Sequence, residues 1–386
     1  MLRITSQNSP YTLLQQRLQY IALHPDRPFT ILIENVPQWD TPLQPVTSKQ
    51  SYICDYAPCN GYDFLLNGLK ERDQSKYQSY VQNENMLITN GAMHALSLIF
   101  RSLYKPGGIA LVQAPVLGNI ADILKASGYQ IVYFSSDQAE MLGQLEPLYT
   151  DDVRFIYINT PHNPFGGILS ESVVKELVNF AQERNVALIA DMIYDSYTFD
   201  GNVTYSPLVV STDWQHLYTV NSMSKNYGAP GLRIGWITSD MENIKKLSGL
   251  CEAECVAISG LSQLQAYDLI QKGNDELVAI VRHRKEYVEQ QLAKIENIQY
   301  HIPAGGTQFF VKLPVDDIDL FADFVLLEYG LALTTTSNYD GIECSYIRVP
   351  IIHSVEMIEK ALELLVKGME EFGRLCHSDS VLGARN

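Results

Sequence analysis

A lysine with the surroundings of a nucleophile lies in the segment SMSKNYGAPGLRIGW, residues 222–236. Ser222 and Ser224 come directly before Lys225, and Arg233 follows a Pro-Gly pair. An amine of this kind can condense with an aldehyde cofactor, while hydroxyl groups and a guanidinium can bind a phosphate. The alternative is an exposed turn that carries serine and lysine without any chemical role.

A carboxylate, a phenol and an amide complete the set of reactive side chains. Asp191 ends the apolar run VALIAD and Tyr194 follows it closely, while Asn163 lies in the turn NTPHNPFGG. A carboxylate at the end of an apolar strand needs a cationic partner, and a protonated ring nitrogen would be one. Tyr194 and Asn163 could hydrogen-bond an oxygen of that ring. Helix capping by Asp191 and a plain turn at Asn163 remain open, and we expect His162 to be structural.

The segment ITNGAMHALSLIF predicts a helix whose start could bind a phosphate. Asn90 is the expected N-cap, and Gly91 and Ala92 are small enough to bring bare backbone N–H groups against an anion. An ordinary capped helix with no ligand fits the same residues.

These residues need a sheet that brings them to one edge. Short apolar runs alternate with amphipathic stretches between residues 86 and 240, and the runs are 109–113, 131–134, 154–158, 186–190, 217–220 and 234–237. The stretch SESVVKELVNFAQERN, residues 170–185, places its apolar residues on one helical face. This alternation predicts an α/β layer with a mostly parallel sheet, whose ligands bind at the carboxyl ends of the strands.

The rest of the chain predicts a second, smaller domain. A long charged helical stretch, 264–295, precedes a mixed segment and a final amphipathic helix. We expect a large domain over 50–260 and a small α+β domain over 1–49 and 261–386, with the first residues as an N-terminal arm that packs on the small domain or on a partner subunit.

Composition excludes several classes of function. The formal net charge is −16, which disfavours binding to nucleic acid and to anionic membranes. The six cysteines form no C-x-x-C pair and no cluster with histidine in the sequence, so we expect free thiols and no metal. Neither a membrane-spanning run nor a signal peptide is present, and we expect a cytoplasmic protein.

Taken in order, these motifs resemble the class I/II aminotransferase family of fold-type I enzymes, which depend on pyridoxal 5'-phosphate. The resemblance extends from about residue 35 to about residue 348. It implies a mostly parallel seven-stranded sheet sandwiched by helices, beside a smaller α+β domain. It also implies a reaction that moves the amino group of an α-amino acid to a keto acid.

The resemblance assigns roles to the motif residues. Lys225 would form the internal aldimine and carry protons, Asp191 would keep the pyridine nitrogen protonated, and Asn163 and Tyr194 would contact the ring oxygen. The phosphate would be bound by Gly91, Ala92, Met93, Ser222, Ser224 and Arg233, and by Tyr56 of the neighbouring subunit in a homodimer with shared active sites. Arg348 would bind the substrate carboxylate.

Several positions depart from the family pattern. Leu117 stands where an aromatic ring usually stacks on the cofactor, and Phe165 replaces a threonine beside it. Asn35 replaces a glycine, so we expect its side chain to enter the substrate pocket or to form hydrogen bonds within it. The segment LCEAECVAIS has no arginine for a second carboxylate, which disfavours dicarboxylate substrates. As a hypothesis, Glu252 or Glu254 would face a basic substrate instead.

Other functions remain open to a lesser degree. The altered pocket residues Asn35 and Leu117 keep elimination, cyclisation or oxidation of an amino acid as an alternative reaction. A ligand-sensing module of a transcription regulator is disfavoured because few residues precede the family match and the chain is acidic. A dinucleotide-binding oxidoreductase is disfavoured because no G-x-G-x-x-G follows a strand.

Overall fold

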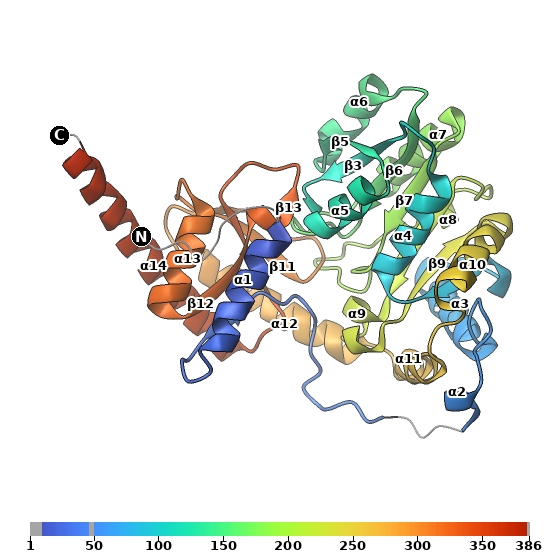
Figure 1. Ribbon diagram of the computed structural model, residues 1–386, viewed down its shortest axis with the longest axis horizontal. Helices are drawn as coiled ribbons and strands as arrows, with labels where there is room; N and C mark the ends of the chain where they lie inside the picture. Colours follow the sequence, from blue (N-terminus) through green and yellow to red (C-terminus); the bar gives the residue numbers. More distant parts are fainter. Residues whose placement is uncertain (1–9, 46–49, 384–386) are drawn as a thin grey trace.

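The computed structural model describes residues 10–45 and 50–383. Residues 1–9, which carry part of the expectation that no signal peptide is present, lie outside the described residues. Figure 1 shows two bodies side by side, one built on a large sheet and one on a smaller sheet near the two ends of the chain.

The large body is built on a seven-stranded sheet in the order β2-β9-β8-β7-β6-β3-β5. The neighbours from β8 to β5 run parallel, whereas β9 is antiparallel to both β8 and β2. The strands are β2 (Met86–Thr89), β3 (Ile109–Ala114), β5 (Gln130–Ser135), β6 (Val153–Asn159), β7 (Ala187–Asp191), β8 (Leu217–Ser222) and β9 (Gly235–Ser239). The mostly parallel α/β sheet expected from the sequence is confirmed.

Helices cover both faces of this sheet, as Figure 1 shows. Alternate residues of a strand enter different cores: Leu111 packs with α6 and α7, whereas its neighbour Val112 packs with α4 and α5. The helices are α2 (Ser51–Cys54), α3 (Asp63–Tyr77), η1 (Asn83–Asn85), α4 (Ala92–Leu103), α5 (Gly118–Ala126), α6 (Gln138–Leu148), α7 (Glu171–Arg184), α8 (Pro207–Val210), α9 (Met223–Asn226), η2 (Pro230–Leu232), α10 (Met241–Cys255) and α11 (Gly260–Lys272). The result is a three-layer sandwich.

The small body has a five-stranded sheet in the order β1-β12-β14-β11-β10. Its strands are β1 (Thr30–Leu32), β10 (Gln299–Tyr300), β11 (Gln308–Lys312), β12 (Leu331–Thr335) and β14 (Tyr346–Pro350), and its helices are α1 (Pro10–Leu23), α12 (Asp275–Leu292), α13 (Ile318–Tyr329), η3 (Thr336–Asn338) and α14 (Val355–Gly383). A two-stranded ribbon of β4 (Val116–Leu117) and β13 (Tyr339–Asp340) connects the two bodies.

The N-terminal arm packs on the small body. Arg17 of α1 is fully buried and donates to Asp323 at 3.0 Å and to Asp319 at 3.1 Å, both on α13. β1 pairs in parallel with β12, which brings the first described strand beside the last third of the chain. Figure 1 shows α1 lying against these C-terminal elements, as expected of an arm.

The helical stretch expected over 264–295 is wrong as a single element. It divides into α11 and α12 at Gly273, which has a φ of 76° and ends α11. Ala266 and Leu269 of α11 pack in the core of the large body, whereas Val281 and Val288 of α12 pack in the small one. The domain boundary expected near residue 260 stays a prediction. None of the helices in the described ranges has the length and apolar character that a membrane span requires.

Candidate active site

The carboxyl ends of three neighbouring strands bring the predicted residues together. Asn159 ends β6 and lies opposite Asp191, the last residue of β7. Ser222 ends β8, and the short helix α9 that follows carries Lys225. The sequence places these residues far apart, but the parallel pairing puts them at one edge of the sheet.

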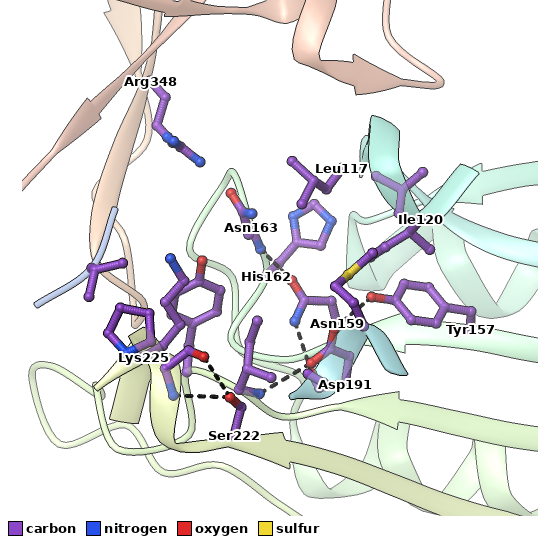
Figure 2. A pocket seen from close by; sticks show the side chains of 18 of the residues that line it. Leu117, Ile120, Tyr157, Asn159, His162, Asn163, Asp191, Ser222, Lys225 and Arg348 are labelled. Carbon is purple, nitrogen blue, oxygen red and sulfur yellow. Dashed lines mark hydrogen bonds between the residues drawn. The ribbon is translucent and has the colours of Figure 1, made fainter. Parts of the chain in front are cut away.

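They line a cavity of 310 Å³ between the two bodies. Its lining includes the predicted residues Ala92, Met93, Leu117, Asn163, Asp191, Tyr194, Ser222, Ser224, Lys225, Arg233 and Arg348. Gly91, Asn35 and Tyr56 are not in this lining. Figure 2 shows Arg348 extending toward the cavity from the small body, with Lys225 and Asp191 on the opposite side.

One end of the cavity has the donors of an anion site. The start of α4 lies here, together with the Ser222 and Ser224 hydroxyls, which are 3.0 Å apart, and the guanidinium of Arg233. The expectation that Asn90 is the N-cap of α4 is wrong. The N-cap residue is Gly91, which has a φ of 80° and no side chain that could accept a hydrogen bond from the helix. The first N–H groups are therefore not occupied by a capping side chain, and they suit a phosphate.

Gly91 is required by its neighbour Arg233. A Cβ atom at Gly91 would lie 2.4 Å from Nη2 of that arginine, so no other residue fits without displacing the guanidinium. Arg233 itself adopts a left-handed backbone conformation, with a φ of 53°, and its Nη1 donates to the carbonyl of Pro230 at 3.0 Å. Gly91 thus acts by its close approach to Arg233 rather than by lining the cavity.

The amine of Lys225 is buried, and its pKa lies close to neutral pH. Its pKa is lowered from 10.5 to about 7, by burial first and by the positive charge of Arg348 second, against the opposing effect of Glu34. Nζ donates to the carbonyl oxygen of Asn35 at 2.8 Å. A substantial fraction of this lysine is neutral at pH 7, which is the form that attacks a carbonyl.

Asp191 is the deepest carboxylate of the site. It accepts from the Tyr157 hydroxyl at 2.9 Å and from the backbone N–H of Ile193 at 3.3 Å. Burial raises its pKa to about 6, although both hydrogen bonds oppose that rise. A cationic ring nitrogen placed here would remove the penalty for the charged form. Tyr157 was not predicted as a site residue, because it lies inside β6, where an aromatic side chain is expected to belong to the hydrophobic core.

Arg348 has bonding capacity left for a ligand. Its Nη1 donates to the hydroxyl of Tyr339 at 3.2 Å and its Nη2 to the carbonyl of Ile33 at 2.5 Å, while its buried Nε has no partner among the described residues. Tyr339 in turn donates to Oδ1 of Asn163 at 3.0 Å. An unpartnered guanidinium nitrogen beside the cavity suits a carboxylate. Nothing in the sequence around Tyr339 signalled that it links Asn163 to Arg348.

The Asn35 side chain does not line the cavity but hydrogen-bonds to Tyr194, which does, and a role of Asn35 in substrate binding stays a prediction. Asn35 is buried, and its Oδ1 accepts from the Thr307 hydroxyl at 2.7 Å while its amide donates to Gln308. Within the site, its side-chain amide donates to the Tyr194 hydroxyl at 3.4 Å, and its backbone carbonyl accepts from Nζ of Lys225. The side chain therefore positions the Tyr194 hydroxyl by a hydrogen bond and does not fill the cavity.

The other departures from the family pattern have different outcomes. Leu117 lines the cavity from β4, whereas Phe165 packs against Phe310 and Tyr346 and does not reach it. His162 also lines the cavity and is buried, with its Nδ1 unpartnered among the described residues. Burial lowers its pKa to about 4, so its ring is neutral at pH 7 and cannot act as a cation there.

Three predicted residues lie apart from this cavity. Tyr56 is 85% exposed, which leaves it available to another molecule. Glu252 and Glu254 are on α10, outside the cavity lining, and Glu254 pairs with Arg101 and with His94. Glu254 is thus already paired within the chain, whereas the hypothesis that Glu252 or Glu254 faces a basic substrate stays a prediction, because the corresponding position in the family lies across the subunit interface.

A possible ligand cluster was also missed. Donor atoms of His94, Cys251 and Cys255 lie within 4.8 Å of one another, because α4 places a histidine beside the helical cysteine pair. Both ring nitrogens of His94 are already hydrogen-bonded, to the N–H of Asn90 and to Glu254. The expectation of no metal therefore stays a prediction.

Comparisons with known proteins agree with this geometry. Residues 33–365 match the model of the family described as aminotransferase class I and II. The chain belongs to the class I and II aminotransferase family. Transfer of an amino group between an amino acid and an oxo acid is thus its activity, and pyridoxal 5'-phosphate is its cofactor.

Two similar aminotransferases have a guanidino compound or an arginine derivative in their names. The L-aspartate:5-guanidino-3-methyl-2-oxopentanoate transaminase of Pseudomonas syringae pv. syringae is 40% identical, over 96% of this chain and 97% of its own. The 3-methylarginine biosynthesis aminotransferase ArgM of Streptomyces arginensis is 35% identical, over 94% and 98%.

A solved structure shows the same aminotransferase fold. The aspartate aminotransferase of Thermotoga maritima superposes with a TM-score of 0.84 and 22% identity, over 94% of this chain and 98% of that one. The fold-type I architecture expected from the sequence is confirmed.

Proposed function

We propose that the predicted residues hold pyridoxal phosphate in the cavity and carry out the transfer. When bound, the cofactor supplies a ring that withdraws electrons from the substrate α-carbon. The observation that supports this proposal is the placement of the Lys225 amine, whose pKa is lowered to about 7, in the same cavity as the Asp191 carboxylate. Lys225 holds the cofactor aldehyde and then moves the proton between the α-carbon and the cofactor. Asp191 keeps the ring nitrogen protonated.

The remaining residues position the two partners. The phosphate is bound by Ala92, Met93, Ser222, Ser224 and Arg233. Gly91 leaves the space that the Arg233 guanidinium occupies. Asn163 and Tyr194 donate to the ring oxygen, and Leu117 covers one face of the ring. Arg348 binds the substrate α-carboxylate, with its Nε and Nη1 directed to the two oxygens. The small body thereby takes part in substrate binding, because Arg348 comes from β14.

We further propose that one member of the substrate pair carries a guanidino group, as arginine does. The support is the names of the two relatives at 40% and 35% identity, each aligned over almost its whole length. These relatives are transaminases, which favours amino transfer over elimination, cyclisation or oxidation. The name of the Pseudomonas relative also includes L-aspartate, which is a dicarboxylate. The expectation that dicarboxylates are poor substrates therefore stays a prediction, to be tested together with the guanidino substrate class.

A steady-state comparison of amino donors tests this substrate class. We expect kcat/KM for L-arginine, with a common oxo acid acceptor, to exceed that for L-citrulline and L-norleucine. L-Aspartate belongs in the same panel as a donor. A preference for the uncharged amino acids over L-arginine would contradict the proposal.

The lowered pKa of Lys225 predicts how the apoenzyme recaptures its cofactor. The neutral amine is the attacking form, so the rate should rise with pH through a midpoint near 7 and then level off. Stopped-flow absorbance after addition of pyridoxal phosphate measures this rate. A rate that continues to rise toward the ordinary lysine pKa of about 10.4 would show that another lysine reacts.

Removal of the guanidinium at position 233 should weaken cofactor retention. We expect Arg233→Ala to raise the Kd for pyridoxal phosphate about 10- to 100-fold, because a charge-assisted contact to the phosphate is lost. Fluorescence titration of the apoenzyme measures this Kd. Arg282→Ala, on α12 and outside the cavity, is the matched control. An unchanged Kd in Arg233→Ala would refute the phosphate role.

We propose a cytoplasmic homodimer in which Tyr56 reaches the partner's phosphate. The exposed tyrosine is a suitable donor, and the five cysteines whose side chains are described are free thiols, as in a reducing compartment. A monomer mass in sedimentation equilibrium would contradict the dimer.

A further inference from the structure

The segment that follows β1 alternates its side chains between the protein interior and the cavity. Ile33 and Asn35 are 3% and 2% exposed, whereas Glu34 and Val36 line the cavity. An extended backbone gives this period of two. The Glu34 side chain therefore faces the space that a substrate would enter, although the sequence motif drew attention to its neighbour Asn35.

The two backbone carbonyls beside Glu34 are held by the two cations of the site. Ile33 accepts from Nη2 of Arg348 at 2.5 Å, and Asn35 accepts from Nζ of Lys225 at 2.8 Å. Carbonyls two residues apart on an extended chain are separated by about 7 Å. A substrate with its carboxylate on Arg348 and its α-carbon near Lys225 thus runs alongside residue 34.

The charges of the cavity leave Glu34 without a permanent partner. The cavity is lined by two carboxylates, Glu34 and Asp191, and by the cations of Lys225, Arg233 and Arg348. Glu34 makes no hydrogen bond or ion pair with any residue in 10–45 or 50–383, although its charge acts on both Lys225 and His353. In the loaded enzyme, Lys225 is bonded to the cofactor, Arg233 faces the phosphate and Arg348 faces the substrate carboxylate. Glu34 is exposed at the cavity, so its carboxylate stays accessible to a cationic group of the substrate.

We propose that Glu34 binds the guanidinium at the end of the substrate side chain and so selects basic amino acids. This inference rests on the guanidino substrate class proposed above. An arginine side chain places its guanidinium carbon about 6 Å from the α-carbon, which is within reach of a glutamate beside the substrate. Two parallel N–H···O bonds would form between the planar guanidinium and the carboxylate.

Alternative carboxylates are less well placed. Glu252 and Glu254 are on α10 and do not line the cavity, and Glu254 is already paired with Arg101. Asp191 accepts from the Tyr157 hydroxyl at 2.9 Å, and in the proposed function it would hold the ring nitrogen of the cofactor. Among the described residues that line the cavity, Glu34 is thus the carboxylate still free for a substrate.

A comparison of L-arginine with L-citrulline in wild type and Glu34→Gln tests the inference. Citrulline replaces the guanidinium by an uncharged ureido group of nearly the same shape. We expect Glu34→Gln to lower kcat/KM for L-arginine about 10- to 100-fold and to leave that for L-citrulline within about 3-fold, because only the charge-assisted pair is lost. The inhibition constant of 5-guanidinopentanoate, which has no amino group to transfer, should rise by a similar factor, whereas that of hexanoate should not.

Two variants serve as comparisons. Glu176→Gln, an exposed residue of α7, controls for the loss of one negative charge and should change neither substrate. Glu252→Gln tests the competing carboxylate. Equal losses for arginine and citrulline in Glu34→Gln, or a loss for arginine only in Glu252→Gln, would overturn the role of Glu34.

The outcomes also separate this inference from the proposed function. If wild type shows no preference for L-arginine over L-citrulline, the guanidino substrate class is wrong and the role of Glu34 falls with it. If wild type prefers L-arginine and Glu34→Gln keeps that preference, the substrate class stands and only the role of Glu34 is wrong.

Discussion

Lys225→Ala should lower kcat by about 10⁴-fold, because one side chain both attaches the cofactor and carries the proton of the transfer. The amine is buried at the carboxyl end of β8, and its pKa of about 7 keeps much of it neutral. Alanine should leave the phosphate site intact, so the variant should still bind pyridoxal phosphate, but more weakly and without a covalent link. Steady-state assays and the cofactor's absorbance measure the two effects.

Lys175→Ala is the matched control for this variant. Lys175 lies on the exposed side of α7, where it pairs with Glu171 at 2.5 Å. Its removal should leave turnover and covalent attachment unchanged. Multiple turnovers by Lys225→Ala, with the cofactor still reducible onto the protein by borohydride, would show that a different lysine carries the reaction.

Asp191→Asn should lower kcat/KM by about 10²- to 10³-fold, because an asparagine cannot stabilise a protonated ring nitrogen by charge. The fold should survive the change. Burial raises the pKa of Asp191 to about 6, so the folded protein binds this proton more tightly than the unfolded chain does. The charged carboxylate therefore reduces stability as pH rises from about 4 to 6, and asparagine removes that penalty. The apoenzyme of Asp191→Asn should melt at the same temperature as wild type or higher at pH 7.5.

The contrast with Asp195 makes this prediction specific. Asp195 is equally buried, but it accepts from Arg72, Tyr77 and Asn221, and the positive charge of Arg72 lowers its pKa against the effect of burial. Asp195→Asn should therefore destabilise the protein by about 3–5 kcal/mol, since the buried guanidinium of Arg72 loses one of its two carboxylate partners and keeps only Asp73. In Asp191→Asn, the ¹⁵N shift of labelled cofactor should report an unprotonated ring nitrogen. A protonated nitrogen there would contradict the role of Asp191.

Local patterns predicted the large body well. Six apolar runs correspond to β3, β5, β6, β7, β8 and β9, because buried parallel strands are continuous hydrophobic segments bounded by turns. Strand ends also predicted which side chains meet at the cavity, since Asp191 and Ser222 each close a strand and line it. Strand β2 was not predicted, and its pairing with β9 joins segments that are distant along the chain.

The parts that sequence could not predict depend on side-chain direction and distant contacts. Asn35 and Glu34 are adjacent, and only the register of the extended segment decides which of the two faces the cavity. Tyr339 links Asn163 to Arg348 through hydrogen bonds between residues far apart in the sequence. Gly273 ends one helix inside a charged stretch that the sequence predicted to be continuously helical. The break was not predicted, because one glycine changes the helical pattern of a long stretch very little.

A single turnover of the holoenzyme with L-arginine, in the absence of any oxo acid, shows whether this site transfers the amino group to its cofactor. We expect the absorbance of the aldehyde form of the cofactor to be replaced by that of its amine form. One equivalent of 5-guanidino-2-oxopentanoate should appear per protomer, and no ammonia should be released. Release of ammonia with the cofactor still in its aldehyde form would contradict amino transfer at this site.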